Sequence, residues 1–326
     1  MDIETVFPGD PLETTVKYAG AQLAPFSVPW AKGRVQLCTG FNTQRSQNDA
    51  LFLTRSAFWD VESVPLHYRQ CQLTSIRDES ASDIASKSEI TSFAVSASVG
   101  GSFLGASGRG SYEKSVRENK NKSNISVRAE HICGQIDLGH IPRLDLGAIR
   151  LLSDSPDPIN EFRRAYGDFY VAGLRVGAVN NTTISGEMAN KSFFEATRLQ
   201  LKIKALFLTH NKSIDDVNQS KSNSGGLSVA AFDSLTAFYS NFTAHNLEDG
   251  LTAGYIASDN KQKAMNLGNR ASEVLFKEFS LGLNGAVYQD SVDRLCDRGL
   301  VTELLLAPYS SLREYQSLLS LRYNRR

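Results

Sequence analysis

Apolar and polar positions alternate with a period of two from Phe93 to Phe103. The odd positions are apolar apart from one glycine, and the even positions are mostly serine. This period is typical of a β-strand with one apolar and one polar face. A glycine-rich run and a charged stretch follow, and a second alternation begins at Ile125. The pattern predicts a strand, a polar tip and a returning strand over about residues 90–136.

A second unit of the same kind follows later in the chain. Apolar side chains alternate with polar or charged ones from Arg198 to Leu208, at Leu199, Leu201, Ile203, Ala205 and Phe207. Residues 209–226 are polar, and residues 227–238 again have a β-like composition. The sequence therefore predicts a second strand, tip and strand over about residues 198–240.

Helical spacing is confined to other parts of the chain. Asp157 and Pro158 form a typical helix start, and Ile159, Phe162 and Tyr166 follow at helical spacing. Two further helices are predicted, over residues 263–279 and around residues 312–319. Residues 73–89 carry little signal for ordered structure, and residues 169–177 predict a strand broken by glycines. This mixed order, without regular βαβ alternation, predicts one α+β domain over residues 1–326, built around an antiparallel sheet.

Composition and charge narrow the functional classes. Apolar residues make up 41 % of the 326 residues, which is typical of a folded chain. Lys plus Arg and Asp plus Glu both number 35, so the sequence lacks the basic excess of a general nucleic-acid binder. The first ten residues have neither the basic nor the apolar region of a signal peptide. We expect cytoplasmic synthesis, with any action outside the cell reached by unconventional secretion.

Catalytic motifs are not evident in the sequence. None of the five histidines has zinc-site spacing, and no serine has the glycine pattern of a nucleophile elbow. The run from Gly105 to Gly110 lacks the Gly-Lys-Ser/Thr of a phosphate loop. His131 and Cys133 share a strand face, where two half-buried side chains are the simpler interpretation. With four unpaired cysteines in addition, we expect reduced thiols, no metal, no cofactor and no enzymatic activity.

One short segment carries a family resemblance. Residues 166–178 resemble the signature of the membrane attack complex/perforin (MACPF) domain, within the superfamily that includes the cholesterol-dependent cytolysins (CDC). Tyr166, Gly167, Tyr170 and Gly177 match it, whereas Asp168, Phe169 and Ala178 replace its usual Thr/Ser, His and second Gly. The two amphipathic units flank this segment in the order that the family has.

The resemblance implies a fold and a mechanism. The fold would have a bent, twisted antiparallel central sheet flanked by helices, with two convertible hairpin segments. Gly173 and Gly177 are then candidate hinge positions, for which a turn or bulge glycine is the simpler alternative. The family's proteins assemble into rings on membranes and insert both segments as β-hairpins.

The two amphipathic strands have the dimensions that insertion requires. A membrane strand needs about 9–11 residues with alternating lipid-facing and lumen-facing side chains. Both Phe93–Phe103 and Arg198–Leu208 contain 11 residues. Their candidate membrane-facing residues are Phe93, Val95, Val99, Phe103, Leu199, Leu201, Ile203 and Phe207. Because backbone groups in a bilayer must all be paired, such hairpins require a closed homo-oligomeric ring.

The sequence leaves two functions open. The first is a pore-forming protein that acts on a lipid membrane. No separate membrane-targeting module is evident, so a docking partner protein is one expectation. The alternative is a non-lytic interaction or structural protein with the same fold, which the missing targeting module supports. The charges of the first tip leave it open, because they make crossing a bilayer costly for a single hairpin. A lipid- or sugar-binding module has no aromatic cluster to support it.

Overall fold

The structure, a computed structural model, describes residues 20–30, 34–44, 53–80, 122–187, 228–236, 238–243, 259–260, 262–281 and 285–323. The chain divides into two compact units. Unit 1 consists of Met1–Pro11, Gln72–Ile132 and Gly177–Val274, and unit 2 of Leu12–Cys71, Cys133–Val176 and Leu275–Arg326. The single domain predicted over residues 1–326 stays a prediction. The predicted strands 93–103 and 198–208, with all eight candidate membrane-facing residues, lie outside the described residues.

The described strands form a 10-stranded sheet. Their bounds are β1 (Phe26–Pro29), β2 (Gly40–Phe41), β3 (Leu53–Thr54), β4 (Leu66–Ser80), β5 (Lys122–Leu138), β6 (Phe169–Glu187), β7 (Ser228–Asp233), β8 (Phe238–Thr243), β9 (Gly285–Val287) and β10 (Val301–Pro308). The hydrogen-bonded order is β1-β10-β6-β5-β4-β9, while β2 pairs with β3 and β6, and β7 pairs with β6 and β8. Helices accompany this sheet, so the predicted α+β class with an antiparallel sheet is confirmed.

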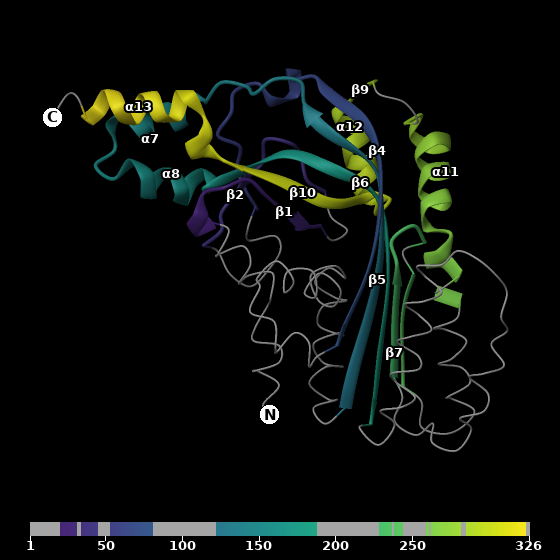
Figure 1. Cartoon of the computed structure of the whole chain (residues 1–326). Helices are drawn as coiled ribbons and strands as arrows, with labels where there is room; N and C mark the ends of the chain where they lie inside the picture. Colours follow the sequence, from purple (N-terminus) through teal and green to yellow (C-terminus); the bar gives the residue numbers. More distant parts are fainter. Residues whose placement is uncertain are drawn as a thin grey trace, which may run out of the picture. The chain divides into compact units, whose positions relative to one another are not determined.

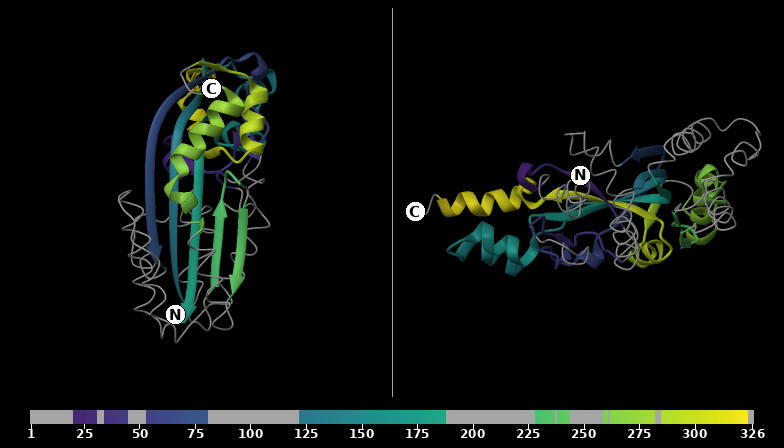
Figure 2. Two further views of the ribbon diagram at one scale, coloured as in Figure 1. Left: turned by 90° about the vertical axis from the view of Figure 1, so that its right-hand side faces the viewer. Right: turned by 90° about the horizontal axis from the view of Figure 1, so that it is seen from below.

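Three long strands dominate the sheet. Strands β4, β5 and β6 contain 15, 17 and 19 residues and lie next to one another (Figure 2). The contacts Pro65–Gly139, Arg69–Asp137 and Thr74–His131 show that β4 and β5 run antiparallel, because one number falls as the other rises. Strand β5 contains the predicted alternation that begins at Ile125.

Strand β4 corrects one expectation. Residues 73–89 carry little signal for order, yet β4 continues to Ser80. The side chains from Arg69 to Thr74 are exposed, so no apolar face marks this part of the strand. Pairing of its backbone with β5 supplies the order that side-chain pattern does not reveal.

Strand β6 corrects a second expectation, that of a strand broken by glycines. It runs unbroken through the glycines of residues 169–177. The irregularities there are two register shifts against β10, one between Val301 and Glu303 and one where Leu305 pairs with Gly173 and Leu306 with Val171. One extra residue, Ala172, is thereby accommodated as a β-bulge in an otherwise continuous strand.

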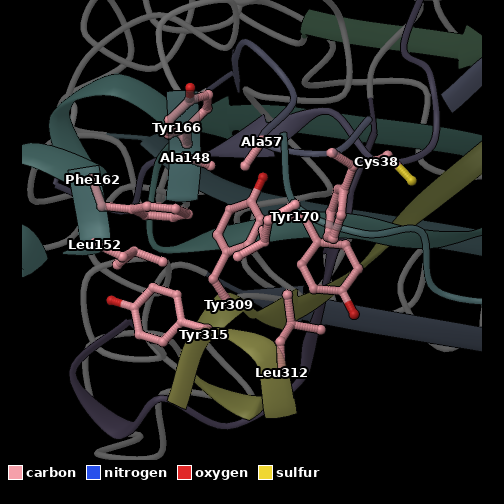
Figure 3. Close-up of a cluster of buried hydrophobic side chains, with 12 residues drawn as sticks. Cys38, Ala57, Ala148, Leu152, Phe162, Tyr166, Tyr170, Tyr309, Leu312 and Tyr315 are labelled. Atoms are coloured by element: carbon pink, nitrogen blue, oxygen red, sulfur yellow. The ribbon is translucent and has the colours of Figure 1, made fainter. Parts of the chain in front are cut away.

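Helices of unit 2 surround one buried cluster. α7 (Leu146–Asp154), α8 (Pro158–Tyr166) and α13 (Arg313–Tyr323) lie side by side, and the last two were predicted (Figure 1). The 3₁₀ turns η1 (Val61–Ser63) and η5 (Tyr309–Ser311) and helix α12 (Gln289–Asp297) also belong to this unit. Twelve buried residues pack between them (Figure 3): Cys38, Ala57, Phe58, Leu144, Ala148, Leu152, Phe162, Tyr166, Tyr170, Tyr309, Leu312 and Tyr315.

Unit 1 contains the pairing of β6 with β7 and of β7 with β8. Asn180 pairs with Asp233 at one end of the antiparallel β6–β7 ladder, and Ser185 pairs with Ser228 at the other. Helix α11 (Leu267–Phe279), predicted from the sequence, has most of its residues in this unit. Leu267, Ala271 and Leu275 form its buried stripe, the first two within unit 1.

Candidate functional site

Tyr166, the first residue of the signature, closes helix α8. Its side chain is 1 % exposed, and its phenol donates a hydrogen bond to Asp145 Oδ1 at 3.2 Å. The guanidinium of Arg55 lies 4.4 Å from the centre of the ring, and the Tyr166 carbonyl accepts a hydrogen bond from Thr54 Oγ1 at 2.6 Å. Tyr166 thus joins α8 to the start of α7 and to β3.

Gly167 ends the helix in a conformation that requires glycine. Its φ of 88° and ψ of −176° lie in a region that residues with a Cβ rarely adopt. A Cβ here would also come within 2.2 Å of the Phe41 carbonyl oxygen. The glycine of the signature is therefore explained by backbone geometry at the junction of α8 and β6.

Asp168, which replaces the usual Thr or Ser, takes a structural role. Its Oδ1 accepts a hydrogen bond from the Thr43 backbone N–H at 2.9 Å, and the Thr43 hydroxyl donates to its Oδ2. Its own N–H donates to the Phe41 carbonyl at 3.0 Å, and its carbonyl accepts from the Tyr309 N–H at 3.0 Å. This contact leaves no signal in the sequence, because Thr43 is 125 residues away.

Tyr170 anchors β6 in the cluster of Figure 3. Its ring lies 5.0 Å from Phe58 and 5.2 Å from Tyr309, measured between ring centroids. Burial raises the pKa of Tyr170 to about 12, so the phenol stays neutral at physiological pH. The first part of β6 is thereby held by aromatic packing within unit 2.

Gly173 and Gly177 lie where strands approach closely. A Cβ at Gly177 would come within 1.9 Å of the His131 carbonyl oxygen, and one at Gly173 within 2.8 Å of Asp137 Oδ1. Neither glycine is among the described residues with positive φ. Close approach to the β5 backbone thus explains Gly177, whereas the nearest atom at Gly173 is a side-chain oxygen that can move. The role of both glycines as hinges stays a prediction.

Charged side chains pair across neighbouring strands of unit 2. Arg69 of β4 donates from Nε to Asp137 Oδ2 of β5 at 2.9 Å. Arg175 of β6 lies 2.5 Å from Glu303 of β10, with both side chains partly exposed. Such pairs fix the register of antiparallel strands more than they add stability.

The thiols of the described residues are mostly buried. Cys38, Cys133 and Cys296 are buried, Cys71 is exposed, and none forms a disulfide. Burial raises the pKa of Cys38 to about 12 and that of Cys296 to about 11, so both are thiols at neutral pH. His131 is half-buried and its Nδ1 is hydrogen-bonded to Thr74 Oγ1 at 2.7 Å, in keeping with the simpler interpretation of the His131–Cys133 pair.

The described residues contain neither a metal-binding group of side chains nor a helix that could span a membrane. No group of three or more His, Cys, Asp or Glu residues there is placed to hold a metal ion. In the same residues, every helix is too short or too polar to cross a membrane.

Comparison with known proteins gives structural similarities only. The sequence matches no family model and no curated protein. GNIP1Aa from Chromobacterium piscinae aligns with 91 % of this chain at 13 % identity and a TM-score of 0.37. A putative cell invasion protein with a MAC/perforin domain from Bacteroides thetaiotaomicron aligns with 91 % at 11 % identity and a TM-score of 0.34. The cytotoxin protein suilysin from Streptococcus suis aligns with 87 % at 9 % identity and a TM-score of 0.39.

One of these structures, the cell invasion protein, has a MAC/perforin domain, the kind of domain whose signature residues 166–178 resemble. The chain spans 56 %, 62 % and 59 % of the length of the three proteins, in the order given. Because each TM-score is below 0.5, the proposal that follows rests on the strands of this chain and not on these similarities.

Proposed function

We propose that this protein assembles into a ring on a membrane and perforates it by extending two strand pairs as β-hairpins. The observation that carries the proposal is the place of two connections in the sheet. Residues 81–121 join β4 to its neighbour β5, and residues 188–227 join β6 to its antiparallel partner β7. Each connection is thus the tip of an existing strand pair, which can lengthen without any change of strand order.

The lengths of the two connections suit this extension. They contain 41 and 40 residues, counted between the ends of the flanking strands. Half of either connection is about twice the 9–11 residues that a membrane-spanning strand needs. The alternating runs Phe93–Phe103 and Arg198–Leu208 fall within them, one in each.

Assembly follows from the backbone. A lone hairpin in a bilayer leaves two edges of unpaired N–H and C=O groups, at a cost of several kcal/mol for each group. A closed ring of copies pairs every edge, so insertion depends on a homo-oligomer bound to the membrane. The proposed activity needs neither a cofactor nor a catalytic group.

A vesicle assay tests the function directly. Purified protein is added to liposomes that contain a self-quenched dye, and samples are imaged by electron microscopy. A hexahistidine-tagged form on liposomes with nickel-chelating lipid bypasses any need for a docking partner. We expect dye release together with rings of uniform diameter, and release on the chelating liposomes alone assigns docking to a partner.

A fluorescence experiment tests which face enters lipid. In a Cys71→Ser background, which removes the exposed native thiol, an environment-sensitive dye is attached at Val95→Cys or, as the matched control, Ser96→Cys. Leu201→Cys and Lys202→Cys form the same pair in the second segment. We expect a blue shift and gain of intensity on membranes at positions 95 and 201, and no comparable change at 96 and 202.

The alternative is a non-lytic protein of the same fold. The charges of the first tip favour it, because Lys114, Arg117, Glu118, Lys120 and Lys122 must cross the bilayer before the strands do. Binding to liposomes without release, rings or blue shifts, even on chelating liposomes, would establish this alternative and overturn the pore.

A further inference from the structure

A buried charged cluster lies in unit 1, between the β6–β7 ladder and helix α11. The side chain of Asp233, the last residue of β7, is 0 % exposed and that of Arg270 on α11 is 25 % exposed. Arg270 donates from Nη1 to Asp233 Oδ2 at 2.8 Å and from Nη2 to Oδ1 at 2.9 Å. This two-pronged geometry is the strongest form of an Arg–carboxylate pair.

Neutral groups complete the cluster. Asn180 of β6 donates to Asp233 Oδ2 at 2.9 Å, and both the N–H and the hydroxyl of Thr236 donate to Oδ1 at 3.1 Å. Asn180 also exchanges two hydrogen bonds with Asn260, which is fully buried. Although burial favours the neutral acid, these donors outweigh it and hold the pKa of Asp233 below its ordinary value. The carboxylate is thus fully charged and fully partnered.

The position of the cluster in the ladder is specific. Asn180 and Asp233 are the pair at the end of the β6–β7 ladder that is farthest from residues 188–227. The turn after Asp233 is fixed to β6 by two hydrogen bonds between Val179 and Ser234. Arg270 therefore connects α11 to the root of the strand pair whose tip is the second connection.

A buried ion pair suits a reversible closure better than an apolar contact does. Its geometry defines one position of the helix on the strands, and a misplaced helix would leave a charge buried without a partner. Once the helix and the strands separate, both charges regain their hydration, which offsets the loss of the pair. Apolar surfaces gain nothing comparable on exposure to water.

We propose that Asp233 and Arg270 form a clasp that holds α11 on the root of the β6–β7 pair and whose opening sets the rate of hairpin extension. The clasp itself is independent of any activity of the protein. Its link to the rate of extension rests on the pore function proposed above.

Hydrogen exchange followed by mass spectrometry tests the clasp on the full-length protein without membranes. Arg270→Gln leaves the Asp233 carboxylate buried without its cation, so we expect amides of α11, β7 and β8 to exchange at least tenfold faster, with unit 2 outside α11 unchanged. The matched control is Glu278→Gln on the same helix, whose ion pair with Arg298 is exposed. That control leaves exchange at the wild-type rate.

A double variant keeps the exchange test decisive if Arg270→Gln does not fold. Asp233→Asn with Arg270→Gln leaves no charge buried without a partner, so it should fold if the single variant does not. It still lacks the charged pair, so we expect α11 to exchange faster than in the wild type here too. The clasp is overturned if amides of α11 exchange at the wild-type rate in the variant that folds. It is also overturned if exchange accelerates equally throughout both units.

Dye-release kinetics then test its link to activity. The lag before dye release should be several-fold shorter in Arg270→Gln, or in the double variant if only that one folds, than in the wild type and the Glu278→Gln control. An unchanged lag alongside faster exchange overturns the link. If the wild-type protein releases no dye, the pore function fails while the exchange measurements still decide the clasp.

Discussion

Gly177 of β6 lies directly against the carbonyl group of His131 on β5. A Cβ at position 177 would come within 1.9 Å of that oxygen and 2.9 Å of the Ile132 Cα, both backbone atoms that cannot rotate away. The Gly177→Ala substitution therefore forces the two strands apart. We expect it to lower the free energy of unfolding by about 1–3 kcal/mol, the usual cost of an overpacked site.

Urea unfolding followed by circular dichroism measures this loss. The matched control is Gly285→Ala in β9, where a Cβ would meet nothing within 4 Å. That substitution should change stability by no more than about 0.5 kcal/mol. Equal unfolding midpoints for the two variants would show that β5 and β6 do not approach as closely as described.

Gly167 gives a second prediction, because its constraint is of a different kind. Its φ of 88° and ψ of −176° belong to a region that even asparagine rarely visits. We expect Gly167→Ala and Gly167→Asn to destabilise the protein alike, each by about 2 kcal/mol or more. If Asn restored the stability lost with Ala, a left-handed conformation would explain the glycine instead. Thermal unfolding of both variants beside the wild type decides between them.

The sequence predicted those parts of the fold that side-chain pattern specifies. The alternation from Ile125 lies in β5, and the spacing of Phe162 and Tyr166 lies in α8. The extension of β4 beyond residue 73 was not predictable, because Leu73 and Thr74 are exposed and mark no buried face. The order of β4 comes from pairing with β5, where Thr74 contacts His131, 57 residues away, which leaves no local trace.

The candidate site likewise contains residues that the sequence predicted and residues that it did not. Tyr166, Gly167 and Tyr170 were found by resemblance, and the structure explains them by burial and by backbone conformation. Asp233 and Arg270 were missed, since an Asp in a polar turn and an Arg on a helix are individually ordinary. Only the fold brings these two side chains, 37 residues apart, into a buried pair.

Phe162 provides a third prediction, within the aromatic cluster of unit 2. Its ring is 1 % exposed and lies 5.1 Å from each of Tyr166, Tyr309 and Tyr315, measured between centroids. Phe162→Ala leaves a cavity in the middle of the cluster and should lower the free energy of unfolding by about 3–5 kcal/mol. Ile159→Ala on the same helix is the control, because Ile159 is 42 % exposed and should lose under about 1 kcal/mol. Chemical denaturation of both variants makes the comparison, and similar losses would contradict the packing shown in Figure 3.

His131 gives the last prediction, a dependence of stability on pH. Its Nδ1 is hydrogen-bonded to Thr74 Oγ1, and its ring lies against Gly268 of α11, where a Cβ would come within 2.8 Å of Cε1. Burial lowers the pKa of His131 from 6.5. The unfolded chain therefore takes up this proton at a higher pH than the folded protein does. Stability is lost as the pH falls below 6.5, and the loss is complete below the folded pKa.

Urea midpoints measured at several pH values between about 7.5 and 5 test this dependence. His131→Gln should flatten the decline, whereas His140→Gln, at an exposed position, should retain it. Every other titrating group contributes equally to the wild type and the variant, so the difference between their pH profiles isolates His131. Profiles that run parallel would mean that α11 does not exclude water from this ring. A decline that is confined to the wild type and His140→Gln would instead identify the α11–β5 contact as the point where acid weakens unit 1.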